Sequence, residues 1–285
     1  MRYSWEQLCK RLLAALVLCA LCQCEGYSGT PSPLPRDQNV QIFEQRQANR
    51  VTLVAHLTNC TEATITVTMS LVNMAASAAL PMTVDAKGRT RFELLTIQAI
   101  DPRQRFHYQY DYKWRPGRRS GATTSPFIYS LPYLEESHPV LQGPLGTFSH
   151  QAGSGYENAI DFSMPIGSRV CAIRDGTVVA FWQGSDIGGS DPTNRPYANY
   201  LVLAHEDGTF AEYVHLKKNG VMVKLGEKIH MHDAIALSGN TGYSSEPHLH
   251  VCVFRNLDGT NRTTIPIQFA TKSGEIESLR EGQVY

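Results

Sequence analysis

The sequence lacks an excess of charge of either sign. Lysine and arginine together number 26, and aspartate and glutamate also number 26 among the 285 residues. Proteins that bind nucleic acid or an anionic membrane surface electrostatically need a basic surface. The composition therefore predicts no nucleic-acid partner. With 42% hydrophobic and 18% charged residues, the chain can form an ordinary globular core, and its length suits two domains.

The N-terminal apolar run is too short for a membrane span. It covers 12–21, about ten residues, whereas a transmembrane helix needs about twenty. Basic residues at positions 2, 10 and 11 precede it and polar residues follow it, which is typical of a secretory signal. We expect residues 1–24 to be a signal peptide, the protein to be exported (periplasmic, cell-envelope or secreted), and the chain to have no stable membrane span. Leu21-Cys22-Gln23-Cys24 resembles a lipoprotein acylation site, but Gln23 stands where a small residue is needed.

Cysteine is scarce outside this segment. Only Cys60, Cys171 and Cys252 follow residue 24, so at most one intramolecular disulfide can form. Cys171 and Cys252 are the plausible pair because both lie in strand-like runs of one domain, and buried free thiols are the alternative. No Cys-x-x-Cys pair remains beyond residue 24, which excludes a zinc ribbon.

Long stretches with helical periodicity are also missing from the rest of the chain. Residues 25–38 are rich in proline, serine and glycine and predict a flexible leader. Short alternating runs separated by turn residues follow, and they predict an immunoglobulin-like β-sandwich over 39–132. Further strand-like runs predict a second β domain over 133–285. The predicted fold class is all-β.

A His-x-His pair near the C-terminus is the clearest chemical signal. His248 and His250 lie in an apolar, β-favouring run, so their side chains project from the same face of a strand, roughly 6.5 to 7 Å apart. That spacing suits one imidazole that binds a metal and another that handles protons beside it. Two histidines on a solvated strand face would give the same pattern. Asp161 is a second candidate because it alternates with Ile160 and Phe162 and needs a cation or donors.

The remaining histidines of the second domain favour structural roles. His230 and His232 also form His-x-His, but they follow a turn, which favours a solvated pair. His205 precedes a predicted hairpin turn and is expected at the surface. His138 has no motif around it.

Several spaced motifs make residues 139–255 resemble the lysostaphin-type zinc endopeptidases, which cut peptidoglycan cross-bridges. The resemblance implies an antiparallel-β peptidase domain with zinc ligands at Asp161 and His250 and a catalytic pair at His215 and His248. The motifs that carry it are the aspartate followed by a proline-glycine turn at 161–167, the strand pair at 170–178, Tyr213-Val214-His215-Leu216, Leu225-Gly226-Glu227-Lys228-Ile229, Ser238-Gly239-Asn240-Thr241-Gly242 and Pro247-His248-Leu249-His250.

The third metal ligand departs from the commonest form of that family. Many members place a histidine four residues before the aspartate, where this chain has Glu157. Others take the ligand from further upstream, and His150, eleven residues before Asp161, resembles that arrangement. We favour His150, with Glu157 as a substitute ligand and a degenerate, metal-free site as alternatives. A His, Asp, His set suits one Zn²⁺ per chain.

The resemblance implies an exported zinc metallo-endopeptidase whose partners are peptidoglycan peptides. His215 or His248 would be the general base, and spacing does not choose between them. A non-catalytic relative that binds the wall or activates an amidase is the alternative, which Glu157 favours and the histidines at 215, 248 and 250 oppose. The sequence indicates neither the bond cleaved, the oligomeric state nor the role of the sandwich.

Overall fold

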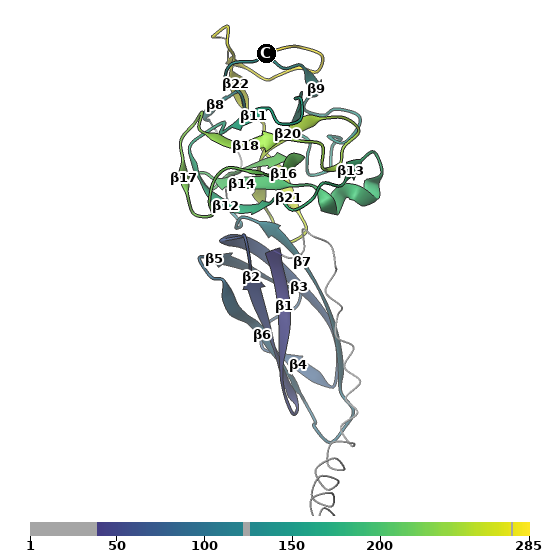
Figure 1. Cartoon of the computed structure of the whole chain (residues 1–285). Helices are drawn as coiled ribbons and strands as arrows, with labels where there is room; N and C mark the ends of the chain where they lie inside the picture. Colours follow the sequence, from purple (N-terminus) through teal and green to yellow (C-terminus); the bar gives the residue numbers. More distant parts are fainter. Residues whose placement is uncertain (1–38, 122–125, 275) are drawn as a thin grey trace, which may run out of the picture.

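A computed structural model describes residues 39–121, 126–274 and 276–285. The predicted signal peptide (1–24) and leader (25–38) lie outside the described residues. The described chain is nearly all β-structure, with one short 3₁₀ helix, η2 (Pro192–Tyr197), so the predicted all-β class is confirmed. Figure 1 shows two parts, with the N-terminal strands stacked against the C-terminal ones. Among the described residues, no helix is long and apolar enough to cross a membrane.

The N-terminal part consists of two sheets that enclose one core. Strand β3 illustrates why strands form here, since Ala63, Ile65 and Val67 alternate along it and are fully buried. The immunoglobulin-like topology of this sandwich stays a prediction. The first sheet contains, in order, β1 (Val40–Gln47), β2 (Arg50–Leu57), β6 (Arg91–Ala99) and β4 (Met74–Ala76). The second contains, in order, β5 (Met82–Lys87), β3 (Glu62–Val72) and β7 (His107–Pro116).

The C-terminal part is built on one large sheet. In order it contains β17 (Lys228–Ile229), β12 (Gly176–Trp182), β14 (Tyr200–Ala204), β15 (Phe210–Val214), β20 (His248–Asn256), β10 (Ile160–Ser163) and β9 (Val140–Gln142), and β21 (Arg262–Thr264) also pairs with β20. Smaller sheets surround it: β11 (Arg169–Cys171), β18 (Ala234–Ser238) and β16 (Leu216–Val221); β13 (Gly188–Gly189) and β19 (Gly242–Tyr243); and β23 (Ile276–Glu277), β22 (Gln268–Ala270) and β8 (Ile128–Ser130).

Strand β8 shows where the sandwich ends. The sequence assigns Ile128–Ser130 to the sandwich domain, 39–132, but this strand runs parallel to β22 in the C-terminal part. The sandwich strands therefore end with β7. The domain boundaries themselves remain predictions.

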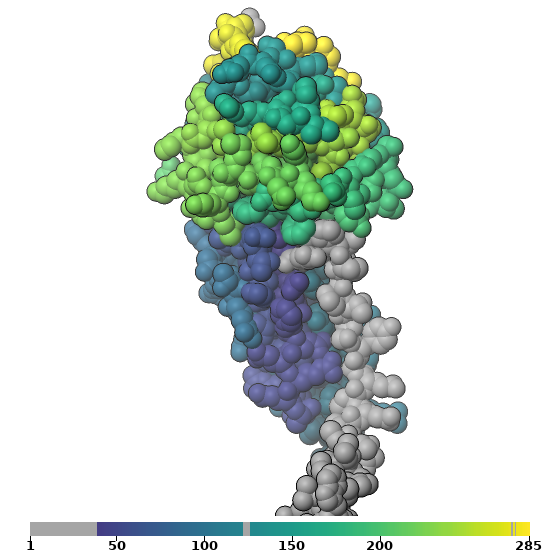
Figure 2. Space-filling model, viewed as in Figure 1, coloured from purple at the N-terminus to yellow at the C-terminus, as the bar shows by residue number. Residues whose placement is uncertain are grey.

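One face of the large sheet packs directly against the sandwich. Along β20, Leu249, Val251 and Val253 belong to the core inside the C-terminal part, whereas Cys252 and Phe254 on the opposite face join a core that includes sandwich residues. Figure 2 shows the two parts in direct contact. An extensive apolar junction of this kind opposes free rotation of two domains.

Hydrogen bonds cross the same junction. The buried Asn256 amide donates to the carbonyls of Pro116 (2.8 Å) and Gly117 (2.9 Å). Asn39, fully buried, donates to the Phe181 carbonyl and the Tyr200 hydroxyl, both at 2.9 Å. These bonds fix the position of the sandwich as well as its distance from the sheet.

The three cysteines of the described chain are buried and free. Cys171 lies on β11 and Cys252 on β20, strands of two different sheets, so the structure shows the free-thiol alternative and no bridge between them. Burial raises the pKa of Cys60 and of Cys252 to about 12, which keeps both thiols protonated at neutral pH.

We predict that Asn256→Ala destabilises the whole chain by about 1–3 kcal/mol, because it removes two buried hydrogen bonds across the junction, to the carbonyls of Pro116 and Gly117. Urea denaturation measures this as a lower midpoint. Gln109→Ala, on the exposed side of β7, is the control and should shift the midpoint by less than about 0.5 kcal/mol. Equal midpoints for the two variants would show that the junction contributes little.

Candidate metal centre

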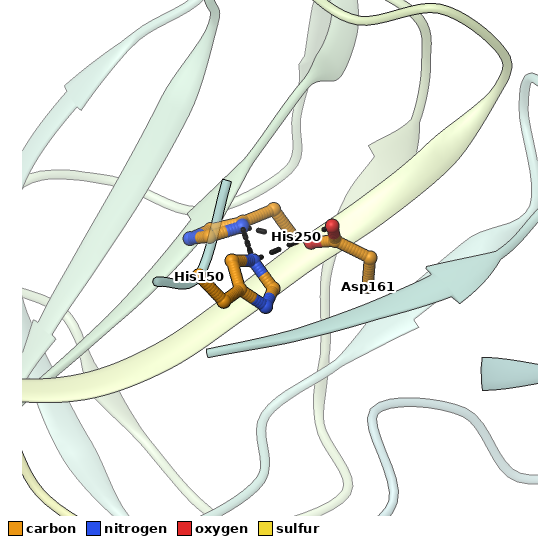
Figure 3. Close-up of side chains that lie close together, drawn as sticks. All are labelled: His150, Asp161 and His250. Carbon is orange, nitrogen blue, oxygen red and sulfur yellow. Dashed lines mark hydrogen bonds and ion pairs between the residues drawn. The ribbon is translucent and has the colours of Figure 1, made fainter. Parts of the chain in front are cut away.

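Three side chains from separate segments meet on the sandwich-facing side of the large sheet. Asp161 on β10 and His250 on β20 are directly opposite each other in the antiparallel register, and His150 approaches from the β9–β10 connection. Figure 3 shows the two imidazoles and the carboxylate converging. His250 Nδ1 lies 2.8 Å from Asp161 Oδ1, and His150 Nε2 lies 3.4 Å from both His250 Nδ1 and Asp161 Oδ2.

Burial and charge make this cluster electrostatically coupled. His150 is fully buried and Asp161 is 7% exposed. Burial by itself would raise the pKa of Asp161, but hydrogen bonds to His150 and His250 hold that pKa well below its usual range. Burial would likewise lower the pKa of His150, and the contact with Asp161 raises it instead. Asp161 is therefore an anion that attracts positive charge into a dry site.

Hydrogen bonds to carbonyls orient the rings. His150 Nδ1 lies 3.1 Å from the Gly143 carbonyl, which can only accept, so Nδ1 donates there and Nε2 is directed into the cluster. His250 has the opposite orientation: its Nδ1 faces the cluster. Its Nε2 is buried and has no hydrogen-bond partner among the described residues.

This donor set fits a zinc ion. One ligand atom from each of His150, Asp161 and His250 lies within 4.8 Å of the others. Tetrahedral zinc with ligand distances of about 2.0–2.1 Å requires ligand atoms about 3.3–3.4 Å apart. The two separations that involve His150, both 3.4 Å, match that value, and His250 Nδ1 and Asp161 Oδ1, now hydrogen-bonded at 2.8 Å, would move slightly apart around the ion. Two neutral imidazoles and one carboxylate leave a fourth position open, as in catalytic zinc sites.

Glu157 is engaged elsewhere. One carboxylate oxygen accepts from the backbone N–H groups of Gly153 (2.8 Å) and Gly155 (3.2 Å), and the other accepts from the Thr264 hydroxyl (3.1 Å). These bonds, after the opposing effect of burial, lower the pKa of Glu157. The carboxylate therefore stabilises the loop that leads into β10. The structure brings His150, rather than Glu157, to Asp161 and His250.

Two further histidines stand next to the three ligands. The rings of His215 and His248 lie 4.4 Å apart, and His248 Nε2 is 4.0 Å from Asp161 Oδ1. His215 Nδ1 donates to the Thr241 carbonyl at 2.6 Å, and His248 Nδ1 donates to the Glu246 carbonyl at 2.8 Å. Each ring therefore presents a bare Nε2. The sequence predicted both residues as the catalytic pair, and that role stays a proposal.

His215 occupies an unusual backbone position. It has φ = +64° between the end of β15 and the start of β16, a left-handed conformation that is uncommon outside glycine. Loss of solvation and the neighbouring charges of His248 and His250 lower its pKa to about 3, against an opposing contact with Thr241. The ring is neutral at pH 7 and can accept a proton or a hydrogen bond.

The cluster opens into a cleft of about 480 Å³. Exposed Phe148 and half-buried Tyr243 stack on one wall with ring centroids 5.8 Å apart, and the Arg195 guanidinium lies 5.3 Å from the Tyr243 ring. Glu246 also lines the cleft, so its walls carry both charge signs beside aromatic surface. A peptide backbone with polar side groups can fit such a surface.

Sequence reasoning was wrong about His205 and missed Gln142. His205 is 4% exposed, because its ring lies against the Asp175 carbonyl and the Tyr129 ring. The Gln142 amide donates to Asp161 (3.0 Å), and its oxygen accepts from the backbone of Phe148 and Ser149, which ties the loop of His150 to the carboxylate. A lone glutamine in a strand gives no signal of this role.

The other histidines set aside in the sequence lie away from the cluster. The side chain of His230 is 80% exposed and His232 is also exposed, as expected for a solvated pair. His138 is buried and its Nδ1 contacts the Ser163 carbonyl at 2.8 Å. None of these residues extends the metal cluster that the described residues form.

A buried His, Asp, His set beside two further histidines in an open cleft is the arrangement of a metal-dependent hydrolase site. Residues 155–262 match the family described as Peptidase family M23. This part of the chain therefore resembles the lysostaphin-type peptidases, which confirms the resemblance found in the sequence.

Curated relatives match the same part of the chain. An uncharacterized metalloprotease of Buchnera aphidicola is 42% identical over 46% of this chain and 32% of its own length. Peptidoglycan DD-endopeptidase ShyA of Vibrio cholerae is 42% identical over 33% of this chain and 19% of its own. Lysostaphin of Staphylococcus simulans is 33% identical over 45% of this chain and 24% of its own. The chain thus spans about a third or less of the length of these relatives.

Solved structures include the catalytic domain of lysostaphin from Staphylococcus simulans. It is 27% identical in sequence, and the match covers 45% of this chain and 87% of that domain with a TM-score of 0.32.

We predict that His150→Ala removes the metal and that Glu157→Ala does not. Zinc content should fall from about one ion per chain to near zero in the first variant, because only two ligands remain. Glu157→Ala should keep the ion and lose about 1 kcal/mol of stability as the loop loses its hydrogen bonds. Elemental analysis of the purified variants measures both, and metal loss confined to Glu157→Ala would reverse the ligand assignment.

Proposed function

We propose that this protein is an exported zinc metallo-endopeptidase that hydrolyses peptide bonds of peptidoglycan, in cross-bridges or stem peptides. The observation that carries the proposal is the convergence of His150, Asp161 and His250 with the pair His215 and His248 in one open cleft. The family M23 domain and the peptidoglycan endopeptidases among its relatives support the substrate class. The apolar run at 12–21, with its basic flank, supports export.

The residues of the cleft divide the work of amide hydrolysis. Zinc held by His150, Asp161 and His250 would supply an acidified water and a polarising charge for the scissile carbonyl. His215 and His248 each offer a bare Nε2, so one ring can accept the proton of the attacking water while the other orients it. The ring that has accepted the proton can then donate it to the leaving amine.

Hydrogen bonds to backbone carbonyls fix the tautomers of His215 and His248 before substrate binds. The Nδ1 atoms of His215 and His248 are already committed to Thr241 and Glu246, so neither ring must change tautomer to act as a base. The left-handed backbone of His215 turns its ring toward His248 rather than along the strand. Such preorganisation lowers the cost of reaching the transition state.

The alternative of a non-catalytic wall-binding or amidase-activating relative depends on a degenerate metal site. Glu157 at the usual third-ligand position suggested that degeneracy. Glu157 accepts hydrogen bonds from its own loop, and His150 lies close enough to Asp161 and His250 to share a metal with them, which supports the catalytic proposal over this alternative.

The zinc-loaded protein should release new amino termini from purified peptidoglycan. A chelator should abolish the release, because the proposed mechanism depends on zinc to activate the attacking water. Labelling of free amines measures both. A parallel assay with oligoglycine separates cross-bridge from stem-peptide cleavage. If the zinc-loaded protein releases no amines from either substrate, the proposed activity is wrong.

We further expect His215→Ala and His248→Ala to keep about one zinc per chain and to lower kcat by about 10²–10⁴-fold, the usual contribution of a positioned acid or base. Exposed His230→Ala is the matched control and should retain wild-type kcat. Full activity in either cleft variant would remove that ring from the mechanism.

A further inference from the structure

A buried ion pair lies beneath the metal centre, and the mechanism above does not use it. Arg262 Nη1 contacts Glu212 Oε2 at 2.6 Å, with the two side chains only 1% and 2% exposed. Glu212 lies on β15 and Arg262 begins β21. Removing both charges from water is expensive, and an apolar pair of similar size is often at least as stable. Stability alone therefore gives no physical reason for placing charges here.

Arg262 holds the loop that leads into β10. Its Nε donates to the Gly155 carbonyl at 3.0 Å, and its guanidinium lies 4.2 Å from the Tyr156 ring and 4.7 Å from the Phe254 ring. The planar fork thus bonds one residue of the loop, stacks on the next, and rests on the sandwich-facing core of the sheet. Asp161 follows this loop five residues later.

Tyr156 connects Arg262 to the proposed metal ligand His250 by direct contact with both. Its ring meets the His250 ring edge-on, with centroids 5.4 Å apart and an interplanar angle of 74°. Aromatic pairs favour this geometry, and it restricts rotation of the imidazole about its bond to the backbone. Tyr156 is therefore held on one side by Arg262 and contacts His250 on the other.

Glu212 lies close to the same imidazole. Val214 is the register partner of His250 on the neighbouring strand, and Glu212 lies two residues before Val214, on the same face of the sheet. Glu212 and His250 both line the cleft. His250 Nδ1 donates to Asp161 Oδ1 at 2.8 Å, and a metal bound at Nδ1 in place of that proton would leave the ring proton on the buried Nε2. A negative charge behind a metal-binding imidazole strengthens its donor nitrogen.

We infer that Glu212 and Arg262 are positioning residues for the metal centre, which set the orientation and donor strength of His250. This inference rests on the proposed function only in taking the His150, Asp161 and His250 cluster as a zinc site. The ion pair touches neither the metal position nor the reacting atoms, so it is expected to act through Tyr156 and the imidazole.

The test is the zinc affinity of a double variant, Glu212→Leu with Arg262→Met, measured by competition with a chromophoric chelator. Removal of both charges together should leave the metal-free protein folded, because no charge remains buried alone. The zinc Kd should rise about 10–100-fold, the usual effect of losing a partner behind a ligand. The absorption bands of the cobalt-substituted protein should shift as the His250 ring reorients.

A second ion pair in this chain provides the matched control. Arg174 contacts Asp207 at 2.6 Å and its guanidinium lies 4.3 Å from the Phe127 ring, near the turn that precedes β15 rather than near the metal centre. Arg174→Met with Asp207→Leu removes a similar pair and should change the zinc Kd by less than about threefold. Circular dichroism of the metal-free proteins shows whether each variant is folded.

Arg262→Lys keeps the inference testable if the double variant fails to fold. Lysine retains the charge beside Glu212 but loses the planar fork that bonds Gly155 and stacks on Tyr156, so a rise of about tenfold in the zinc Kd is expected. An unchanged Kd in a folded variant, double or single, would overturn the positioning role. A wild-type protein that binds zinc but cleaves no peptide would instead contradict the proposed function and leave this inference intact.

Discussion

The pairing of Asp161 with His250 across two antiparallel strands is the contact on which the site depends. These residues are direct register partners, and their side chains emerge from the same face, so a carboxylate and an imidazole meet at 2.8 Å. A shift of one residue between β10 and β20 would turn one of them to the opposite face. The apolar residues that alternate with them, Phe162 and Leu249, are fully buried and oppose such a shift. Hydrophobic packing therefore sets the geometry of the polar site.

The same face of the sheet serves two purposes along its length. On β20, His248 and His250 line the cleft, and Cys252 and Phe254 pack into the core shared with the sandwich. The sandwich thus closes the part of this face that the cleft leaves uncovered. Because Phe254 also supports Arg262, the apolar junction and the metal centre share neighbours. The N-terminal part is consequently a packing partner of the peptidase sheet in addition to being a separate β unit.

Local sequence patterns predicted part of the candidate site. Period-two alternation placed His248 and His250 on one face, and the resemblance to lysostaphin-type endopeptidases added Asp161 and His215. The choice between His150 and Glu157 depended on the path of the β9–β10 connection, which no spacing rule describes. His205 was expected at the surface because a hairpin turn follows it, but its ring lies against Asp175 and Tyr129, so the structure buries it.

The sequence by itself determined the all-β class, the histidine and aspartate candidates and the signature of export, since these follow from composition, alternation and short motifs. Only the tertiary structure decided which third residue reaches the ligand cluster, that Glu157 holds a loop, that the cysteines stay free, and that Glu212 and Arg262 lie together behind His250. The physical reason is the sequence separation over which each interaction acts. Alternation and turn chemistry act between neighbours along the chain, whereas ligand convergence and buried ion pairs join strands that are tens of residues apart and meet only when the sheet and its junction with the sandwich have formed.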